Sequence, residues 1–213
     1  FNDIKKSNFT LIRHDIDLDL HFAEKIAKIE FKEKIKSTYF IQLTCETYNI
    51  FTLNNRILLK KLIKMGHEIG LHFDTSITKD INKEFKFQID TLSEIIDTKV
   101  RSVSLHNPSI NKKIKIFKGY NNAYEKKFYQ NSIYISDSCM LFNKNNIINY
   151  IKSIPYEKSI QILIHPLHFG KKQRLYKEIL LDNIFRYSKT INKNFSVNKT
   201  YKKDKIKEVK FKL

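Results

Sequence analysis

The sequence predicts an α/β fold built on a parallel sheet, and three observations lead to this prediction. Short runs of β-branched and apolar residues alternate along the chain with segments whose apolar residues recur every three or four positions. This alternation is typical of βα units, whose strands lie parallel. Asp and His residues follow directly after several of the predicted strands. The length of 213 residues fits a single domain.

The first part of the chain contains three predicted strands separated by two predicted helices. Gly66 follows the second helix, where a helix end favours a residue that tolerates positive φ. The first helix has Asp17 or Asp19 as its candidate cap. The strands cover residues 9–14, 37–43 and 68–71, and the apolar positions of the helices run from 22 to 29 and from 57 to 65.

The remainder of the chain continues the alternation, with one less regular stretch at residues 110–130, where we expect short strands or loops. Apolar residues between 81 and 96 recur at spacings of three and four, which predicts one helix face. Further strands are predicted at residues 101–105, 133–135 and 160–164, and further helices at 147–154 and 171–187. We expect one domain over residues 1–213, with a core of about 9–190 and a basic C-terminal segment of about 191–213.

The chain is strongly basic, with 40 Lys and Arg against 22 Asp and Glu and a net charge of +18. Such a charge is compatible with nucleic-acid binding. However, the lysines are spread along the chain among apolar residues, and arginine, the preferred phosphate reader, is scarce. The densest basic stretch, residues 199–213, holds seven lysines. We therefore expect no dedicated nucleic-acid partner.

Several protein classes are excluded by composition. No apolar run approaches the roughly 18–20 residues that span a bilayer. Cys45 and Cys139 cannot form a disulfide framework and do not lie in a Cys-x-x-Cys pair. The first twenty residues carry several charges and contain no continuous apolar stretch of a secretory signal. The expected location is therefore the cytoplasm, and the sequence indicates no oligomeric state.

Polar residues at the ends of the predicted strands are the main functional signal. In parallel α/β folds the carboxyl ends of the strands share one edge, where active sites assemble. Five separate segments would bring Asp or His to this edge. These residues are Asp15, Asp17, His72, His106, Asp137 and His165.

Each of these residues also has a structural interpretation. Asp15, Asp17 and Asp19 compete for one helix cap, so at least one carboxylate remains for cation binding or proton transfer. A lone histidine is commonly a satisfied core residue; the nearby carboxylates favour His72 as a metal ligand. His106 is either a third ligand or part of the turn before Pro108.

Two glycines and two further polar residues complete the pattern at this edge. Gly66 and Gly70 are two of only four glycines, which indicates a constrained strand leading to His72. His165 follows a run of apolar and neutral residues and is expected to be held rigidly. Asp137 is equally consistent with a cap and with a site residue.

Taken in order, these segments resemble the polysaccharide deacetylase superfamily, also called the NodB-homology or carbohydrate esterase family 4 group. Within it, the chain is similar to a branch with the pattern RHDVD…GHEIGLH…HRP…LIHP, linked to surface-polysaccharide biosynthesis. The matching segments here read RHDID from Arg13, GHEIGLH from Gly66, HNP from His106 and LIHP from Leu163. The resemblance implies a distorted (β/α)7-type barrel with mostly parallel strands.

The resemblance also implies roles for individual residues. Asp15 matches the catalytic base of the family and Asp17 its metal-binding aspartate. His72 matches the first metal-binding histidine, and His165 the general acid. Substrate-binding or supporting roles are expected for His14, Asp74, Asn107 and Asp137.

The chain departs from the family pattern at two positions. Ser76 stands where the family has a second metal-binding histidine, four residues after the first. Asp74 or His106 can substitute for it, and we favour His106. Asn107 stands where the family has an arginine that orients the base aspartate. The chain also has no Trp to form a wall of the substrate pocket, so Tyr or Phe would serve.

The function implied by the resemblance is metal-dependent hydrolysis of an N-acyl group, mainly N-acetyl, on an amino sugar in glycan or surface-polysaccharide metabolism. The cofactor is a divalent metal, zinc by ligand type, with cobalt or manganese as alternatives. The expected partner is a glycan or glycan precursor that contains an amino sugar. One alternative is a degenerate relative that binds sugar without turnover, and another is a basic nucleic-acid-binding module.

Overall fold

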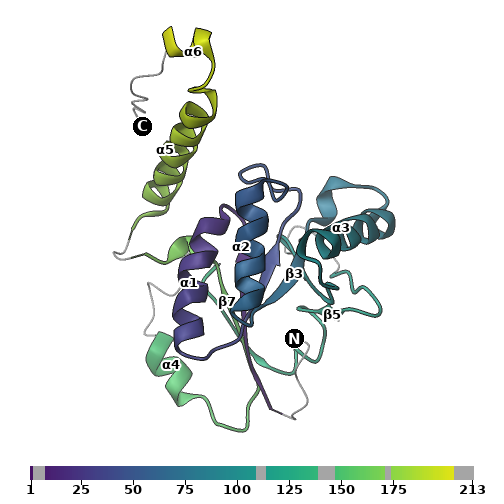
Figure 1. The fold of residues 1–213 in the computed structure, drawn as a ribbon. Coiled ribbons are helices and arrows are strands. Elements are labelled where there is room, and N and C mark those ends of the chain that lie inside the picture. The colour runs from purple at the N-terminus through teal and green to yellow at the C-terminus, as the bar shows by residue number, and fades with distance from the viewer. Residues whose placement is uncertain (2–7, 109–113, 139–146, 171–173, 204–213) are drawn as a thin grey trace. The chain divides into compact units, whose positions relative to one another are not determined.

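The protein contains a seven-stranded sheet in which every neighbouring pair of strands is parallel. The computed structural model describes residues 1, 8–108, 114–138, 147–170 and 174–203. The strand order is β5-β4-β3-β2-β1-β7-β6, and the sheet curls into a half-barrel, which confirms the predicted α/β distorted barrel (Figure 1). The strands are β1 (Thr10–Ile16), β2 (Thr38–Ile41), β3 (Glu68–Phe73), β4 (Ser102–Leu105), β5 (Asn121–Asn122), β6 (Ile133–Ser136) and β7 (Ile160–Ile164).

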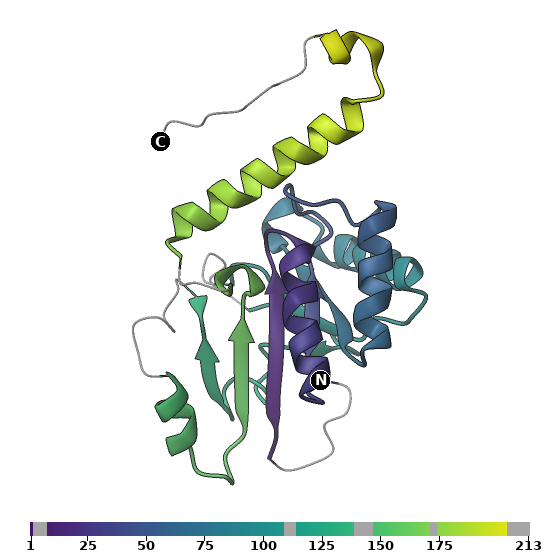
Figure 2. The same cartoon turned by 60° about the vertical axis from the view of Figure 1, so that its left-hand side comes forward.

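Three helices lie together on one side of the sheet, as Figure 2 shows beside β1. Because each helix connects two parallel strands, its apolar face packs against the sheet. The helices are α1 (Leu20–Lys32), α2 (Leu53–Lys64) and α3 (Ile81–Ile96). Shorter helical segments are η1 (Thr75–Ile77), α4 (Ile147–Ser153) and η3 (Pro166–His168).

The chain divides into two compact units, Phe1–Leu167 and His168–Leu213. The first unit contains the whole sheet. The second contains α5 (Tyr176–Phe195) and α6 (Lys199–Lys203). The predicted helix at 171–187 therefore begins at Tyr176 and ends later than expected, and residues 171–173 lie outside the described residues. That residues 1–213 form one domain stays a prediction.

The ends of the helices follow the local sequence. Asp19 caps α1 by accepting a hydrogen bond from the backbone N–H of His21 at 2.8 Å. Because Asp19 serves as the cap, Asp15 and Asp17 are not needed for it. Gly66 follows α2 with φ of 87°, the left-handed conformation predicted for this position.

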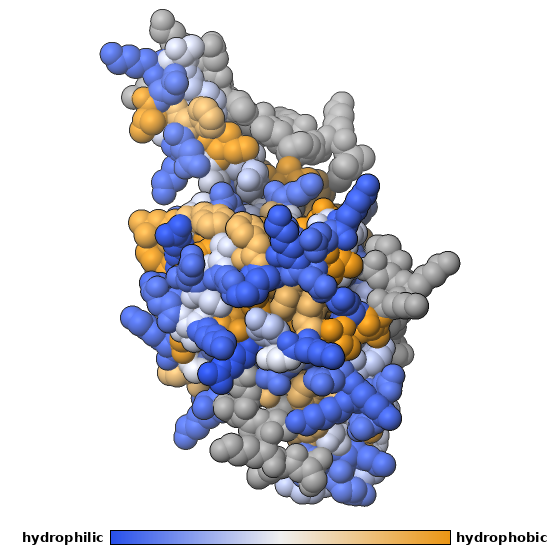
Figure 3. All heavy atoms as spheres, turned by 90° about the vertical axis from the view of Figure 1, so that its right-hand side faces the viewer, coloured by the Kyte–Doolittle hydropathy of each residue, from blue (hydrophilic) through white to orange (hydrophobic). Residues whose placement is uncertain are grey.

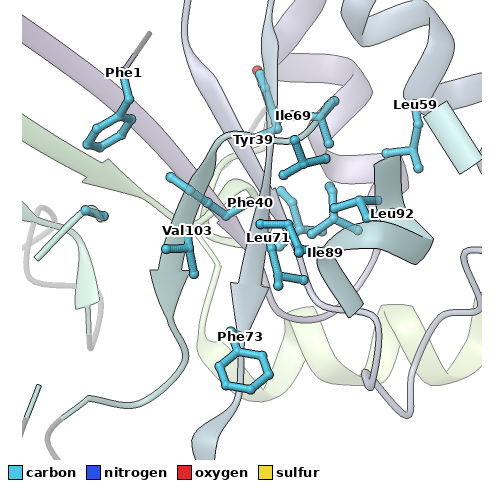
Figure 4. Packing of buried hydrophobic residues seen from close by; sticks show 14 of the residues in the cluster. Phe1, Tyr39, Phe40, Leu59, Ile69, Leu71, Phe73, Ile89, Leu92 and Val103 are labelled. Carbon is cyan, nitrogen blue, oxygen red and sulfur yellow. The ribbon is translucent and has the colours of Figure 1, made fainter. Parts of the chain in front are cut away.

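The core of the first unit lies between the sheet and the helices. Figure 4 shows Leu71 of β3 beside Ile89 and Leu92 of α3, all within one buried cluster. On β3, Gly70 allows a close approach of two neighbours: a Cβ there would lie 2.5 Å from the ring of Phe40 and 3.0 Å from the carbonyl oxygen of Ser102. Glycine is therefore required where β3 passes Phe40, two residues before His72.

The two-residue strand β5 lies in the stretch 110–130, where the sequence predicted short strands or loops. A strand of two residues is too short for a hydrophobic period. The turn before it is held by Asn122, whose side chain accepts from the N–H of Phe117 at 2.8 Å and donates to the carbonyls of Phe117 and Tyr120 at 2.9 and 2.8 Å. These side-chain bonds fix the turn that leads into β5, and β5 pairs with β4 through its backbone.

On the face drawn in Figure 3, hydrophilic side chains are scattered among apolar ones. The basic segment beyond Lys203 lies outside the described residues, as does Cys139. Among the helices that the structure describes, none has the length and apolar character that crossing a bilayer requires.

Candidate functional site

The candidate site lies at the carboxyl ends of β1, β3, β4 and β7. Asp15 is near the end of β1, and Asp17 is the first residue after this strand. His72 lies on β3, His106 directly after β4, and His165 directly after β7. The strand ends therefore bring together the residues that the sequence predicted at this edge.

The loop that carries Asp17 is held by the segment after β2. The thiol of Cys45 lies 3.4 Å from the carbonyl oxygen of Asp17. Thr47 donates to the carbonyl of Leu18 at 2.7 Å, and the hydroxyl of Tyr48 donates to the carbonyl of Ile16 at 2.9 Å. Three consecutive carbonyl groups are thus bound, which fixes the backbone from which the Asp17 side chain projects.

Three side chains, Asp17, His72 and His106, place their ligand atoms around one point. The Oδ1 atom of Asp17 lies 3.1 Å from Nε2 of His72 and 3.7 Å from Nδ1 of His106. The two histidine nitrogens are 3.2 Å apart. Ligands about 2.0–2.1 Å from a tetrahedral zinc ion are about 3.3 Å from one another. The spacing and the N/O donor set therefore fit a divalent metal with a fourth position left for water or substrate.

The carboxylate of Asp17 is strongly stabilised in its ionised form. Burial alone would raise the pKa of Asp17, but the adjacent imidazoles of His106 and His72 and the nearby charge of His165 hold this pKa well below its usual value. A ligand carboxylate must be ionised to bind a cation. The surroundings of Asp17 therefore favour the state that metal binding requires.

His106 is oriented by its neighbour Asn107. The carboxamide of Asn107 lies 2.9 Å from Nε2 of His106, and Asn107 has a positive φ of 44°. Since an amide can present either its oxygen or its nitrogen, its oxygen can accept Nε2–H. This arrangement leaves the lone pair on Nδ1, the atom that faces Asp17.

Asp15 lies beside this cluster and is only 2% exposed. Its Oδ2 atom accepts hydrogen bonds from Arg13 at 3.3 Å and from the hydroxyl of Ser104 at 3.2 Å. Its Oδ1 atom is buried and has no hydrogen-bond partner among the described residues. One oxygen is therefore held by the protein, and the other remains available to accept a proton.

His165 is held by Asp137. Its Nδ1 lies 2.6 Å from Oδ1 of Asp137, and its backbone N–H donates to the other carboxylate oxygen at 2.8 Å. Its Nε2 lies 3.5 Å from Oδ2 of Asp17. Burial would lower the pKa of His165, but the hydrogen bond to Asp137 and the charge of Asp15 raise it above its ordinary value. Of the two interpretations of Asp137, this geometry favours the site residue.

Two of the predicted supporting residues do not serve the site: Asp74 caps a helix, and His14 lies on the other face of β1. Asp74 caps η1 by accepting from the backbone N–H and the hydroxyl of Ser76 at 2.8 and 2.7 Å, so its Oδ1 is already engaged. His14 is not brought to the site, because alternate residues of a strand face opposite sides. Its side chain faces the helices, where Nε2 lies 2.8 Å from Oε1 of Glu30 on α1.

Sequence reasoning assigned no role to Arg13, Tyr124 or Tyr134, which surround Asp15. Arg13 is fully buried, and its Nη2 donates to the hydroxyl of Tyr124 at 2.7 Å. The available signal was that Arg13 precedes Asp15 by two residues and so shares its face of β1. Tyr124 lies in the irregular stretch, where no pattern pointed to the site.

A separate cavity of about 1050 Å³ lies at the opposite edge of the sheet. Residues at the starts of strands line it, among them Thr10, Thr38 and Glu68. It does not include the residues of the candidate site.

No family model and no curated protein matches the sequence. Solved structures do match. Peptidoglycan deacetylase PdaC from Bacillus subtilis is 13% identical, with 88% of this chain and 97% of that chain covered and a TM-score of 0.53. Chitin deacetylase from Colletotrichum lindemuthianum is 12% identical, with coverages of 84% and 81% and a TM-score of 0.52. An acetyl xylan esterase from Clostridium thermocellum, in complex with cobalt, is 12% identical, with coverages of 89% and 91% and a TM-score of 0.50.

The chain also matches a carbohydrate esterase family 4 pseudoenzyme from Bacillus anthracis at a TM-score of 0.48 and spans only 61% of its length. At these low identities the comparisons establish the fold alone. The fold is that of carbohydrate esterase family 4 deacetylases and esterases, as the sequence motifs predicted.

Proposed function

We propose that this protein is a metal-dependent hydrolase that removes an N-acyl group, mainly N-acetyl, from an amino sugar in glycan or surface-polysaccharide metabolism. The observation that carries the proposal is the grouping of Asp17, His72 and His106 next to a buried carboxylate, Asp15, with one free oxygen. The similar structures are described as deacetylases of peptidoglycan and chitin and an esterase of acetyl xylan. These descriptions favour an acyl group on a carbohydrate as the substrate.

The metal would be held by Asp17, His72 and His106, with zinc favoured by two imidazoles and one carboxylate. Bound there, a divalent ion would lower the pKa of a water molecule and polarise the amide carbonyl of the substrate. The low pKa of Asp17 keeps this ligand ionised.

Asp15 is the proposed general base. Its Oδ2 is held by Arg13 and Ser104, whereas Oδ1 has no competing donor among the described residues. Oδ1 would take a proton from the water that attacks the carbonyl carbon. A base whose orientation is fixed in advance needs no reorganisation during the reaction.

His165 is the proposed general acid. Its ring is held by Asp137 through Nδ1, so Nε2 is the atom that faces the cluster. The raised pKa of His165 favours the protonated ring. That proton would pass to the departing amine as the carbon–nitrogen bond breaks.

The experiment that tests this function measures acetate release from N-acetylglucosamine oligomers by the purified, zinc-loaded protein. We expect release that stops after chelation and returns when zinc is restored. The matched control is Asp90→Asn, which removes an exposed carboxylate of α3 that pairs with Lys86, and which should leave the rate unchanged. A zinc-loaded protein that releases no acetate from any acetylated amino sugar would contradict the proposal.

A second candidate, a protein that binds such sugars without turnover, is favoured by Ser76 and Asn107, where the chain departs from the family pattern. Sugar binding without stoichiometric metal and without acetate release would support this candidate. Stoichiometric zinc together with turnover would exclude it.

A further inference from the structure

Arg13 is one of the largest fully buried side chains in the described part of the chain. Its guanidinium group lies on the same face of β1 as Asp15. The Nη2 atom donates to the hydroxyl of Tyr124 at 2.7 Å and to Oδ2 of Asp15 at 3.3 Å. The guanidinium therefore connects the carboxylate of Asp15 to an aromatic side chain from a distant segment.

Aromatic rings fix the position of this guanidinium. Its central carbon lies 4.6 Å from the centroid of the Tyr124 ring, 5.9 Å from that of Tyr134 and 6.0 Å from that of Phe40. Arginine favours such contacts because its planar charge stacks on aromatic faces. The guanidinium is held from several sides and has little freedom to leave Asp15.

A purely structural role explains this arrangement poorly. The Nε and Nη1 atoms of Arg13 are buried without a hydrogen-bond partner among the described residues, which is unfavourable for stability. A buried ion pair can generally be replaced by apolar residues of similar volume without loss of stability. Features that reduce stability without a structural benefit are expected mainly at functional sites.

We propose that Arg13 is a positioning residue, which holds Oδ2 of Asp15 so that Oδ1 faces the reacting water. The proposal rests on the proposed function of Asp15 as the base. Among the described residues, Arg13 is the only Arg or Lys with a nitrogen within 4.0 Å of this carboxylate. Asn107, at the other candidate position for an orienting cation, instead has its amide against His106.

The test compares Arg13→Met, Arg13→Lys and a matched control, Gln161→Met. Methionine keeps the apolar stem but removes the charge, and lysine keeps the charge but not the fork of donors. Gln161 is also fully buried, on the neighbouring strand β7, and donates to the carbonyls of Ala123 and Phe128 without contacting Asp15. Zinc content and the circular dichroism spectrum identify variants that remain folded and loaded.

We expect Arg13→Met to lower kcat about 100-fold, with KM and zinc content near wild type, since a small misplacement of a catalytic group has an effect of that size. Arg13→Lys should be intermediate, and Gln161→Met should keep kcat. A purely structural role predicts instead that Arg13→Met and Gln161→Met affect kcat alike. An Arg13→Met variant that is folded, loaded and fully active would overturn the proposal.

A second readout does not depend on activity. Crystal structures of wild type and Arg13→Met should differ in the orientation of the Asp15 carboxylate, and an unchanged carboxylate would overturn the positioning role. If wild type releases no acetate, the proposed function fails, and the carboxylate orientation alone decides whether Arg13 holds Asp15. If wild type is active and Arg13→Met is equally active, only the role of Arg13 fails.

Discussion

Asp137 binds His165 at two points, through the ring Nδ1 at 2.6 Å and through the backbone N–H at 2.8 Å. Asp137 is 1% exposed, so water competes little for its oxygens. This pairing fixes both the tautomer and the direction of the ring, which are the two properties that a proton donor needs.

The first prediction concerns Asp137→Asn. The amide removes the negative charge beside His165, so the ring loses part of its preference for the protonated form. We expect kcat for acetate release to fall about 100-fold, the lower end of the usual contribution of a general acid. Zinc content should stay at the wild-type level, because Asp137 does not belong to the Asp17 cluster. Full activity of Asp137→Asn would contradict the role of His165.

The second prediction distinguishes the role of Asp15, on β1, from that of Asp17, in the loop that follows. Asp15→Asn should abolish acetate release while zinc content stays near wild type, because Oδ1 can no longer accept a proton. Asp17→Ala should lose zinc. Elemental analysis of both purified variants, run beside the activity assay, provides the measurement. Loss of zinc in Asp15→Asn and its retention in Asp17→Ala would reverse the two roles.

The third prediction tests His106 as the metal ligand that replaces the histidine absent at Ser76. His106→Ala should weaken zinc binding more than about 100-fold, since even residues that only orient a ligand contribute 10–100-fold. A competition titration with a chromogenic chelator measures this change. His21→Ala, which removes an exposed histidine of α1, is the matched control and should bind zinc like wild type. Undiminished affinity in His106→Ala would leave His106 as a turn residue.

The fourth prediction concerns thermal stability and the metal. Zinc at about 100 times its Kd stabilises the folded state by about 2.7 kcal/mol. For a chain of this size we expect the Tm to rise by roughly 5–10 °C on zinc addition. Differential scanning calorimetry of chelated and zinc-loaded protein measures the shift. Asp17→Ala should show no shift, and an equal shift in that variant would place the zinc elsewhere.

The fifth prediction concerns the acid stability of the face of β1 that packs on the helices. Burial would raise the pKa of Glu30, but hydrogen bonds from His14, Tyr39 and Ser37 lower it below the ordinary 4.5. Stability from ionised Glu30 is therefore present above about pH 4.5 and is lost as the pH falls further, through the folded-state pKa. Glu30→Gln should lower the free energy of unfolding at pH 7 by about 1–3 kcal/mol.

The measurement is urea unfolding of wild type and Glu30→Gln between pH 7 and pH 3. The difference between the two proteins should shrink as the pH drops below about 4.5, because the wild-type carboxylate then becomes neutral as well. Glu33→Gln, at the exposed end of α1, is the control and should follow wild type throughout. A difference that is independent of pH would show that the charge of Glu30 does not matter.

The sequence predicted the sheet and most of the candidate site for one physical reason. Parallel strands end at one edge, so Asp17, His72, His106 and His165 could be grouped without knowledge of any distance. Period and glycine placement located the strands that carry them. The position of a strand end does not reveal which face of that strand turns toward the site.

The residues that could not be predicted from the sequence are those whose role depends on which face of a strand or helix they occupy. His14 and Arg13 are adjacent in a buried strand, and nothing in the local pattern states which of the two faces the site and which faces the helices. Glu30 occupies a buried position of α1 while Ile29 is 62% exposed, because Glu30 is the partner of His14. Tyr124 reaches Arg13 from a segment without periodicity, so only the folded chain places it there.

The alternation along β1 has a consequence for folding. This central strand carries buried ionisable groups toward both sides, with Arg13 and Asp15 on one and His14 on the other. A slip of one residue against β2 or β7 would exchange these sides and break the contacts of Arg13 with Tyr124 and of His14 with Glu30. The buried polar groups of β1 would thus destabilise misaligned pairing with its neighbours and favour the native register during folding.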